Sequence, residues 1–374
     1  MLPVTLFGWK ADVLSAGDTS DWSDWNELVE QAPISDVYYR PGYVRAYEAA
    51  GHGRAMGLIL TSSHVRVLVP LLLRPLSDLP FAQGETGFDA ATPYGYGGLL
   101  PLFEIVRPTE SDVHSLFDAL QQWCRDAGIV SCLIRLHPLM DQDRKLSLAL
   151  WHAEANLLHY RGPTVAVHLA RWDRAGQRIA GLRRDRRVAL NRARRCLRVS
   201  WSGSDIPLAE ALALFREIYE QRMAELNASS YYYFPAEYYV TLAEGLGNNL
   251  AVALAWLDRK LVGASLFLAD RQFAHYHLSG SNEEGRELGA ATLLINAGAE
   301  WARERGCRFL HLGGGNYYLD GLFDYKRSFG GVVYRYHTLD VIADELRYRN
   351  LVERRMNFES LPQVRQDFFP QYRA

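Results

Sequence analysis

Three β-type runs follow one another closely in the second half of the chain, and they restrict the folds open to it. Residues 250–257, 261–269 and 272–279 are rich in apolar side chains, and only the short charged segments 258–260 and 270–271 separate them. Connections this short join antiparallel neighbours, because a parallel pair needs a crossover of a dozen or more residues. The pattern therefore predicts an antiparallel meander.

The residues after this meander predict a helix between further strands. A loop at 280–286 leads into a segment whose small and apolar residues share one helical face, and a short strand at 309–312 runs into three glycines. A helix over 320–328 and a long strand over 332–342 follow. Mixed strands and helices in this order predict the α+β class, with a largely antiparallel sheet flanked by helices.

The first half carries a similar but fainter order. Two apolar runs at 55–60 and 65–73 are joined by a polar turn, and a helical pattern and an apolar strand follow over 111–136. A chain of 374 residues exceeds the size at which one core stops growing. Because the composition changes near residue 170, we expect two domains, 1–170 and 171–374.

Composition excludes several classes of protein. The formal net charge is −2, and no apolar run approaches the roughly 18 residues of a membrane-spanning helix. Four scattered cysteines form no CxxC pair, and His275 and His277 find no further ligand at usable spacing, so we expect neither a metal site nor a bound cofactor. The N-terminus lacks the features of a signal peptide, which predicts a cytoplasmic protein with no membrane partner.

A strand that ends in consecutive glycines is followed at short range by a lysine. The glycine turn offers bare backbone donors and room for a substrate, and Lys326 lies one short helix further on. Its ammonium can neutralise the oxyanion that forms when an amine attacks an ester or thioester carbonyl; the alternative is an ordinary surface lysine. The turn residues expected to contact the substrate are Gly313, Gly314, Gly315, Asn316 and Tyr317.

Eight arginines crowd residues 182–198, which we expect to form one helix with an apolar stripe of Leu182, Ala189, Ala193 and Cys196. On a chain of near-zero net charge, such density produces a local positive ridge. Two interpretations stay open: a solvated helix face, and contacts to the phosphates of transfer RNA or of a nucleotide-linked acceptor. The candidate phosphate-binding residues are Arg183, Arg184 and Arg187.

The second half resembles a known family. Gly280-Ser281, Trp301, Gly306, Leu312-Gly313-Gly314 and the stretch 322–330 are similar to the Fem-type aminoacyl-tRNA-dependent transferases and to related FemAB or BioF2-like acetyltransferases. The resemblance is best over about residues 180–340. It implies tandem GNAT-like domains and the formation of an amide on an amino group.

The resemblance also implies roles for particular residues. In the cell-wall enzymes a phenylalanine–lysine pair contacts the substrate, and the lysine supports the transition state. Lys326 matches the lysine and Tyr325 replaces the phenylalanine, so both are expected to be catalytic. Arg286, Gly289 and Ala291 fit the degenerate pattern (Q/R)xxGx(G/A) that holds a pyrophosphate at a helix start in acetyltransferases, although the same pattern also serves simple helix packing. The helical arm that some Fem enzymes use for transfer RNA has no counterpart here.

A loop in the first half is similar to one that lines the acceptor groove of this family. Its Asp89 and Tyr94, joined by Tyr38 and Arg40, are expected to bind and orient an amine, unless the loop is simply packed. His277 is a candidate for a residue that faces the acyl pocket. The group that takes the proton from the amine could be Asp89, His277 or water.

Three functions follow from these patterns. The first is transfer of an aminoacyl group from aminoacyl-tRNA to the amine of a small-molecule or peptide acceptor, with transfer RNA as partner. The second is N-acyl transfer from acetyl- or acyl-CoA as co-substrate. The third is a non-catalytic module that binds RNA or a nucleotide through the arginine helix.

Overall fold

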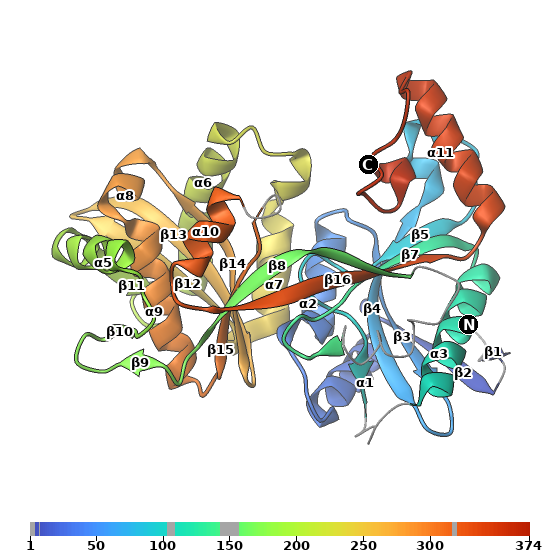
Figure 1. The fold of residues 1–374 in the computed structure, drawn as a ribbon, viewed down its shortest axis with the longest axis horizontal. Coiled ribbons are helices and arrows are strands. Elements are labelled where there is room, and N and C mark those ends of the chain that lie inside the picture. The colour runs from blue at the N-terminus through green and yellow to red at the C-terminus, as the bar shows by residue number, and fades with distance from the viewer. Residues whose placement is uncertain (1–3, 7, 103–108, 143–156, 316–319) are drawn as a thin grey trace. The chain divides into compact units, whose positions relative to one another are not determined.

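The computed structural model describes residues 4–6, 8–102, 109–142, 157–315 and 320–374 (Figure 1). The chain divides into two compact units, one formed by residues 1–161 with 335–374 and the other by residues 162–334. The chain passes between them within β8 (Leu158–His168) and again within β16 (Val332–Ile342). Residues 335–374, which the sequence assigned to the second domain, therefore belong to the first unit.

The first unit is a mixed sheet with helices. Its strands follow the order β1 (Val4–Leu6), β2 (Trp9–Ser15), β3 (Arg54–Thr61), β4 (Arg66–Pro75), β5 (Phe88–Ala91), β7 (Ile129–Arg135) and β16, with β6 (Leu100–Pro101) paired to β4. The neighbours are antiparallel, except for the parallel pair β5–β7. Its longer helices are α1 (Thr19–Gln31), α2 (Pro41–Ala49), α3 (Glu110–Asp126) and α11 (Glu345–Glu359).

The second unit contains the predicted meander. Its strands follow the order β8, β15 (Phe309–Gly313), β14 (Phe273–Ser281), β13 (Lys260–Asp270), β12 (Leu250–Leu257) and β11 (Arg198–Trp201), and β9 (Trp172–Asp173) pairs with β10 (Arg178–Ile179). β12, β13 and β14 are antiparallel, as expected from their short connections. Its helices are α5 (Arg184–Cys196), α6 (Leu208–Glu225), α7 (Ala236–Leu246), α8 (Glu283–Leu288), α9 (Ala290–Glu304) and α10 (Gly321–Arg327).

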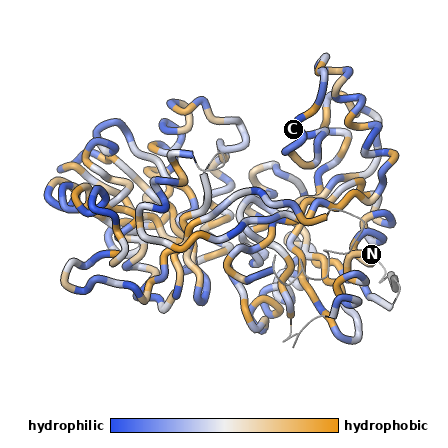
Figure 2. The backbone as a smooth tube through the Cα atoms, in the orientation of Figure 1, coloured by the Kyte–Doolittle hydropathy of each residue, from blue (hydrophilic) through white to orange (hydrophobic). Residues whose placement is uncertain are grey.

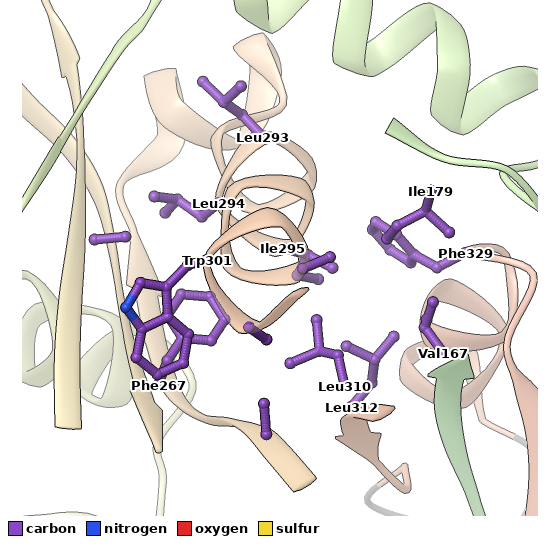
Figure 3. Packing of buried hydrophobic residues seen from close by; sticks show 14 of the residues in the cluster. Val167, Ile179, Phe267, Leu293, Leu294, Ile295, Trp301, Leu310, Leu312 and Phe329 are labelled. Carbon is purple, nitrogen blue, oxygen red and sulfur yellow. The ribbon is translucent and has the colours of Figure 1, made fainter. Parts of the chain in front are cut away.

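The core of the second unit forms around α9. Leu294, Ile295 and Trp301 project from this helix into a cluster with Phe267 of β13 and Leu310 of β15 (Figure 3). The approach of helix to sheet is close, because a Cβ on Gly298 of α9 would lie 2.1 Å from the Phe267 ring. The small residues along α9 therefore serve the packing of helix on sheet, and this packing fixes the end of β15.

Hydropathy along the chain follows this architecture. The strands of the meander and α9 are predominantly apolar, whereas α5 is hydrophilic along most of its length (Figure 2). Among the described residues, no helix combines the length and the apolar character that crossing a bilayer requires.

Candidate active site

The glycine turn and the predicted catalytic lysine meet in the second unit. β15 ends at Gly313, and Lys326 on α10 donates a hydrogen bond from Nζ to the Gly314 carbonyl at 2.6 Å. α10 begins after Asp320, whose carboxylate accepts the Phe323 N–H at 2.7 Å and so caps the helix. The strand end and the helix thus hold a half-buried ammonium group against a backbone carbonyl.

A side chain would be unfavourable at each of the three glycines of the turn. Gly313 adopts φ 76°, a left-handed conformation that side chains disfavour. A Cβ on Gly314 would lie 2.9 Å from the Pro163 carbonyl oxygen, and one on Gly315 would lie 2.1 Å from Oδ1 of Asp320. A left-handed backbone accounts for Gly313, a close backbone carbonyl for Gly314, and the Asp320 carboxylate for Gly315. Asn316 and Tyr317, also expected at the substrate, lie outside the described residues.

Burial and charge act in opposite directions on the lysine. Burial lowers the pKa of Lys326 to about 8, because a charged ammonium loses hydration there, while the negative charge of Asp320 acts to raise it. Sequence reasoning missed Asp320. The available signal was its type, since aspartate directly before a short helical segment is a typical N-cap.

Tyr325 is held firmly beside the lysine. Its hydroxyl lies 3.3 Å from the Thr292 hydroxyl on α9, and the Arg186 guanidinium of α5 lies 5.1 Å from the centre of its ring. Burial raises the pKa of Tyr325, so the phenol stays protonated at neutral pH. Tyr325 therefore connects α10 to both α5 and α9.

The arginine-dense segment forms α5 as predicted, but its apolar stripe differs from the expectation. Leu190, Ala193 and Leu197 are buried at spacings of three and four residues, together with Leu182 before the helix. Cys196 is exposed, and Ala189 is only half-buried. The prediction for these two positions was wrong because the helix turns the stripe 190–193–197 toward the core, so positions 189 and 196 each lie one residue before a buried one.

The first turn of α5 lies against the end of α10. The Arg183 N–H donates to the Ser328 carbonyl at 2.9 Å, and Gly330 approaches Gly181 so closely that a Cβ on Gly330 would lie 2.2 Å from the Gly181 carbonyl oxygen. Asp185 binds both Arg183 and Arg186, and Arg187 donates to the Leu182 carbonyl at 3.1 Å. An open surface depression at this helix start is lined by Arg183, Arg184, Asp185 and Val188.

The predicted pyrophosphate pattern lies between α8 and α9. Gly289 adopts φ 85° and ends α8, and Ala291 lies in the first turn of α9. The Arg286 guanidinium binds Glu225 and the Ser281 carbonyl, each at 2.8 Å. Ala189 of α5 covers the glycine, since a Cβ there would lie 3.3 Å from the Ala189 carbonyl oxygen.

His277 lies in β14 at a change of register, where Leu266 pairs with Leu278 and Phe267 with Tyr276. Its Nε2 lies 3.1 Å from the Tyr238 hydroxyl. Burial, assisted by the nearby His275, lowers the pKa of His277 to about 3, so the ring is neutral at pH 7. A group with so low a pKa is a weak proton acceptor.

Asp89 is fully buried in the first unit and is engaged by two arginines. Its carboxylate binds Arg74 and Arg373, the latter from the C-terminal segment. Both oxygens of the carboxylate therefore have cationic partners within the unit. The role expected for Asp89 in binding an amine stays a prediction.

The other acceptor candidates belong to an aromatic cluster of the first unit. Tyr38 is 2% exposed and meets Tyr43 and Tyr96 edge-on, with ring centres 5.0 and 5.8 Å apart. The backbone carbonyl of Tyr94 accepts a hydrogen bond from the Tyr43 hydroxyl at 2.6 Å. Arg40 lies 3.6 Å from Glu30. These contacts make the cluster a packed element of the unit.

Comparison with known proteins supports the predicted family resemblance. Residues 176–327 match the acetyltransferase (GNAT) domain family. No curated protein sequence matches the chain. Because the matched residues run from the hairpin before α5 to the end of α10, they include the glycine turn and Lys326.

Solved structures share the fold over most of the chain. A crystal structure of FemX is 12% identical and covers 88% of this chain and 98% of its own, with a TM-score of 0.65. The structure of L-PGS from Bacillus licheniformis is also 12% identical, covers 94% and 98%, and gives 0.53. The C-terminal domain of a putative lysylphosphatidylglycerol synthetase from Agrobacterium fabrum is 14% identical, covers 86% and 91%, and gives 0.52.

These comparisons confirm the predicted α+β class and the resemblance to GNAT-like proteins of the Fem type. Residues 176–327 are similar to an acetyltransferase (GNAT) domain, which supports an acyltransferase, and the chain shares the fold of FemX over 88% of its length.

Proposed function

We propose that this acyltransferase forms an amide at the Gly314–Lys326 site. The observation that carries the proposal is the half-buried Lys326 ammonium held 2.6 Å from the carbonyl of the glycine turn. The amine nitrogen attacks the carbonyl carbon of an ester or thioester, and the carbon–oxygen or carbon–sulfur bond then breaks. The leaving group departs with a proton, and the amine loses one. The oxyanion exists after the attack and before the bond to the leaving group breaks, and a nearby cation in a site with little water stabilises it.

The protonation state of Lys326 suits this role. With a pKa of about 8, the side chain is mainly an ammonium at pH 7 and can donate to a developing negative charge. Tyr325 keeps α10 in place through Thr292 and Arg186, which restricts the positions open to the neighbouring lysine. An oxyanion donor that is fixed before the reaction needs little reorganisation during it.

The donor that we propose is an aminoacyl-tRNA, and the acceptor is an amine on a small molecule or peptide. Support comes from α5, whose arginine-rich start is joined to α10 through the Arg183–Ser328 hydrogen bond and the Arg186–Tyr325 contact. A polyanion bound along α5 would therefore bring its acylated end toward the helix that carries Lys326. Exposed arginines and a helix N-terminus both favour phosphate.

Acyl-CoA is the second candidate donor, because residues 176–327 match an acetyltransferase domain. Two contacts weigh against a pyrophosphate at the expected pattern. Ala189 covers Gly289, and Arg286 is already bound to Glu225 and to a carbonyl. A phosphate there would have to displace both arrangements, so we favour the transfer RNA donor.

A transfer assay with matched variants tests the proposal. Radiolabelled aminoacyl-tRNA and acetyl-CoA are offered separately, with polyamines and lysyl peptides as acceptors. We expect product from the charged transfer RNA, and we expect Lys326→Met to lower its rate by about 10² to 10³, the usual effect of removing one oxyanion donor. Arg327→Met is the control, because Arg327 is an exposed cation on the same helix that pairs with Asp324, and it should stay within about threefold of the wild type.

The outcomes separate the candidate functions. Product from acetyl-CoA alone would favour the second donor. Salt-sensitive RNA binding without product from either donor would support a non-catalytic module. Full activity of Lys326→Met would refute the proposed role of the lysine.

A further inference from the structure

Thr164 on β8 has a buried hydroxyl that nothing in the described chain satisfies. The residue is 2% exposed, and its Oγ1 has no hydrogen-bond partner among the residues that the structure describes. Buried polar groups are nearly always paired, because an unmade hydrogen bond costs the full desolvation of the group. Because no described residue pairs with it, this hydroxyl inside a strand can take a partner that arrives with a bound molecule.

Thr164 lies at the glycine turn. The Cγ2 of Thr164 is 3.8 Å from the position that a Cβ on Gly314 would occupy, and the preceding Pro163 carbonyl is 2.9 Å from the same point. Val165, the next residue of β8, pairs with Gly313. The Thr164 methyl group lies beside the Cα of Gly314, and the Lys326 ammonium lies at the carbonyl oxygen of the same residue, so the Thr164 hydroxyl is carried by a neighbour of this turn.

We infer that Thr164 binds the α-amino group of an aminoacyl donor beside Lys326. The inference rests on the proposed function and names the acyl group for that site. An aminoacyl ester offers two polar groups, a carbonyl oxygen for the lysine and an amino group whose N–H can donate to Oγ1. An acetyl or propionyl group offers only the carbonyl. A site built to hydrogen-bond a substrate group discriminates strongly against the analogue that lacks it.

A pair of small probes tests the inference without transfer RNA. The probes are 3′-(L-alanylamino)-3′-deoxyadenosine, an amide analogue of a charged 3′ end, and its 3′-propionylamino counterpart, which lacks only the amino group. The dissociation constant of each is measured by calorimetry. The wild type should bind the alanyl probe at least about tenfold more tightly, the size expected for one hydrogen bond to a charged group.

Variants at position 164 separate binding from structure. Thr164→Val keeps the shape and removes the hydroxyl, so it should abolish the preference for the alanyl probe and leave the affinity for the propionyl probe unchanged. Thr164→Ser keeps the hydroxyl and should retain the preference within about threefold. Ser35→Ala is the matched control, since Ser35 of the first unit is 1% exposed and its hydroxyl also lacks a partner among the described residues.

Several results would overturn the inference. A wild type that does not prefer the alanyl probe would do so, and so would a Thr164→Val variant that keeps the preference. A melting temperature of Thr164→Val several degrees below that of the wild type would show that the hydroxyl is structural. If these results appear while Lys326→Met still abolishes transfer, the proposed function stands and only the role of Thr164 falls.

Discussion

Lys326 occupies a position where two opposing effects set its charge. Burial in the second unit favours the neutral amine, and the nearby Asp320 favours the ammonium. Asp320 also caps α10 through the Phe323 N–H, so one carboxylate supports both the helix and the charge of the lysine. The outcome is a lysine whose pKa is lowered to about 8, so that a modest rise in pH above neutral removes its charge.

The dependence of the rate on pH should report this balance. The pKa of the folded state is lowered to about 8, so the ammonium is present below that value and is lost as the pH rises through it. We expect kcat to fall above about pH 8. Asp320→Asn keeps a capping side chain but removes the charge, so it should move this fall to lower pH.

The control for that measurement is Asp324→Asn. Asp324 is exposed and pairs with Arg327, and its loss should leave the pH profile in place. A profile that is flat from pH 6 to 10 in the wild type would contradict a protonated lysine in the rate-limiting step.

At the scale of elements, α5 combines a buried stripe with a charged outer face. Leu190, Ala193 and Leu197 pack into the core of the second unit. The opposite side of the helix carries three exposed arginines with no ion-pair or hydrogen-bond partner in the part of the chain that the structure describes: Arg184, Arg192 and Arg195. Unpaired guanidinium groups along one face are suited to a row of phosphates.

Binding of uncharged transfer RNA should depend on salt through these arginines. Each phosphate contact adds about 0.7 to 0.9 to the slope of log K against log salt concentration. We expect the triple substitution of Arg184, Arg192 and Arg195 by Gln to reduce that slope by about two to three, as measured by filter binding at several salt concentrations. The same substitution at Arg54, Arg259 and Arg349, which are exposed elsewhere, should leave it nearly unchanged. Equal losses in both variants would indicate nonspecific attraction.

At the scale of the whole molecule, the second unit is inserted into the first. The first unit is completed only when residues 335–374 are added to it. Near the end of the chain, Tyr372 is fully buried, its hydroxyl lies 2.7 Å from that of Ser131 on β7, and its ring meets Tyr348 of α11. Arg373 then binds the buried Asp89. The C-terminal segment is therefore a structural part of the first unit.

Substitution at Tyr372 should weaken the first unit. Tyr372→Ala leaves a cavity the size of an aromatic ring, and we expect a loss of about 3–5 kcal/mol in the free energy of unfolding. Tyr372→Phe removes only the hydroxyl and should cost about 1 kcal/mol. Hydrogen exchange measured by mass spectrometry should show faster exchange in peptides from 1–161 and 335–374, with peptides from 162–334 as the internal comparison. Unchanged exchange in the first unit would contradict this anchoring role.

Several features could be predicted from the sequence because they depend on neighbouring residues. The meander followed from short polar connections, α5 from its arginine density, and the glycine turn from three consecutive glycines. The predicted apolar stripe of α5 was partly wrong. The predicted helical phase was off by one residue, so it included half-buried Ala189 in place of buried Leu190. Spacing gave no sign that Asp89 would be engaged by Arg373, since the two residues are far apart along the chain.

The sequence by itself determined the meander and the longer helices of the second unit, the α+β class, and the presence of a lysine shortly after a glycine-ended strand, because local periodicity and turn chemistry act between residues close in the chain. It missed α8, where we expected a loop, and the short strands β9, β10 and β11. Only the tertiary structure decided that Lys326 bonds the Gly314 carbonyl, that Thr164 lies beside the same glycine with a hydroxyl that no described residue pairs, and that the C-terminal segment returns to the first unit. These are contacts between distant segments. They depend on how the apolar faces of the whole chain pack together, which a spacing pattern does not specify.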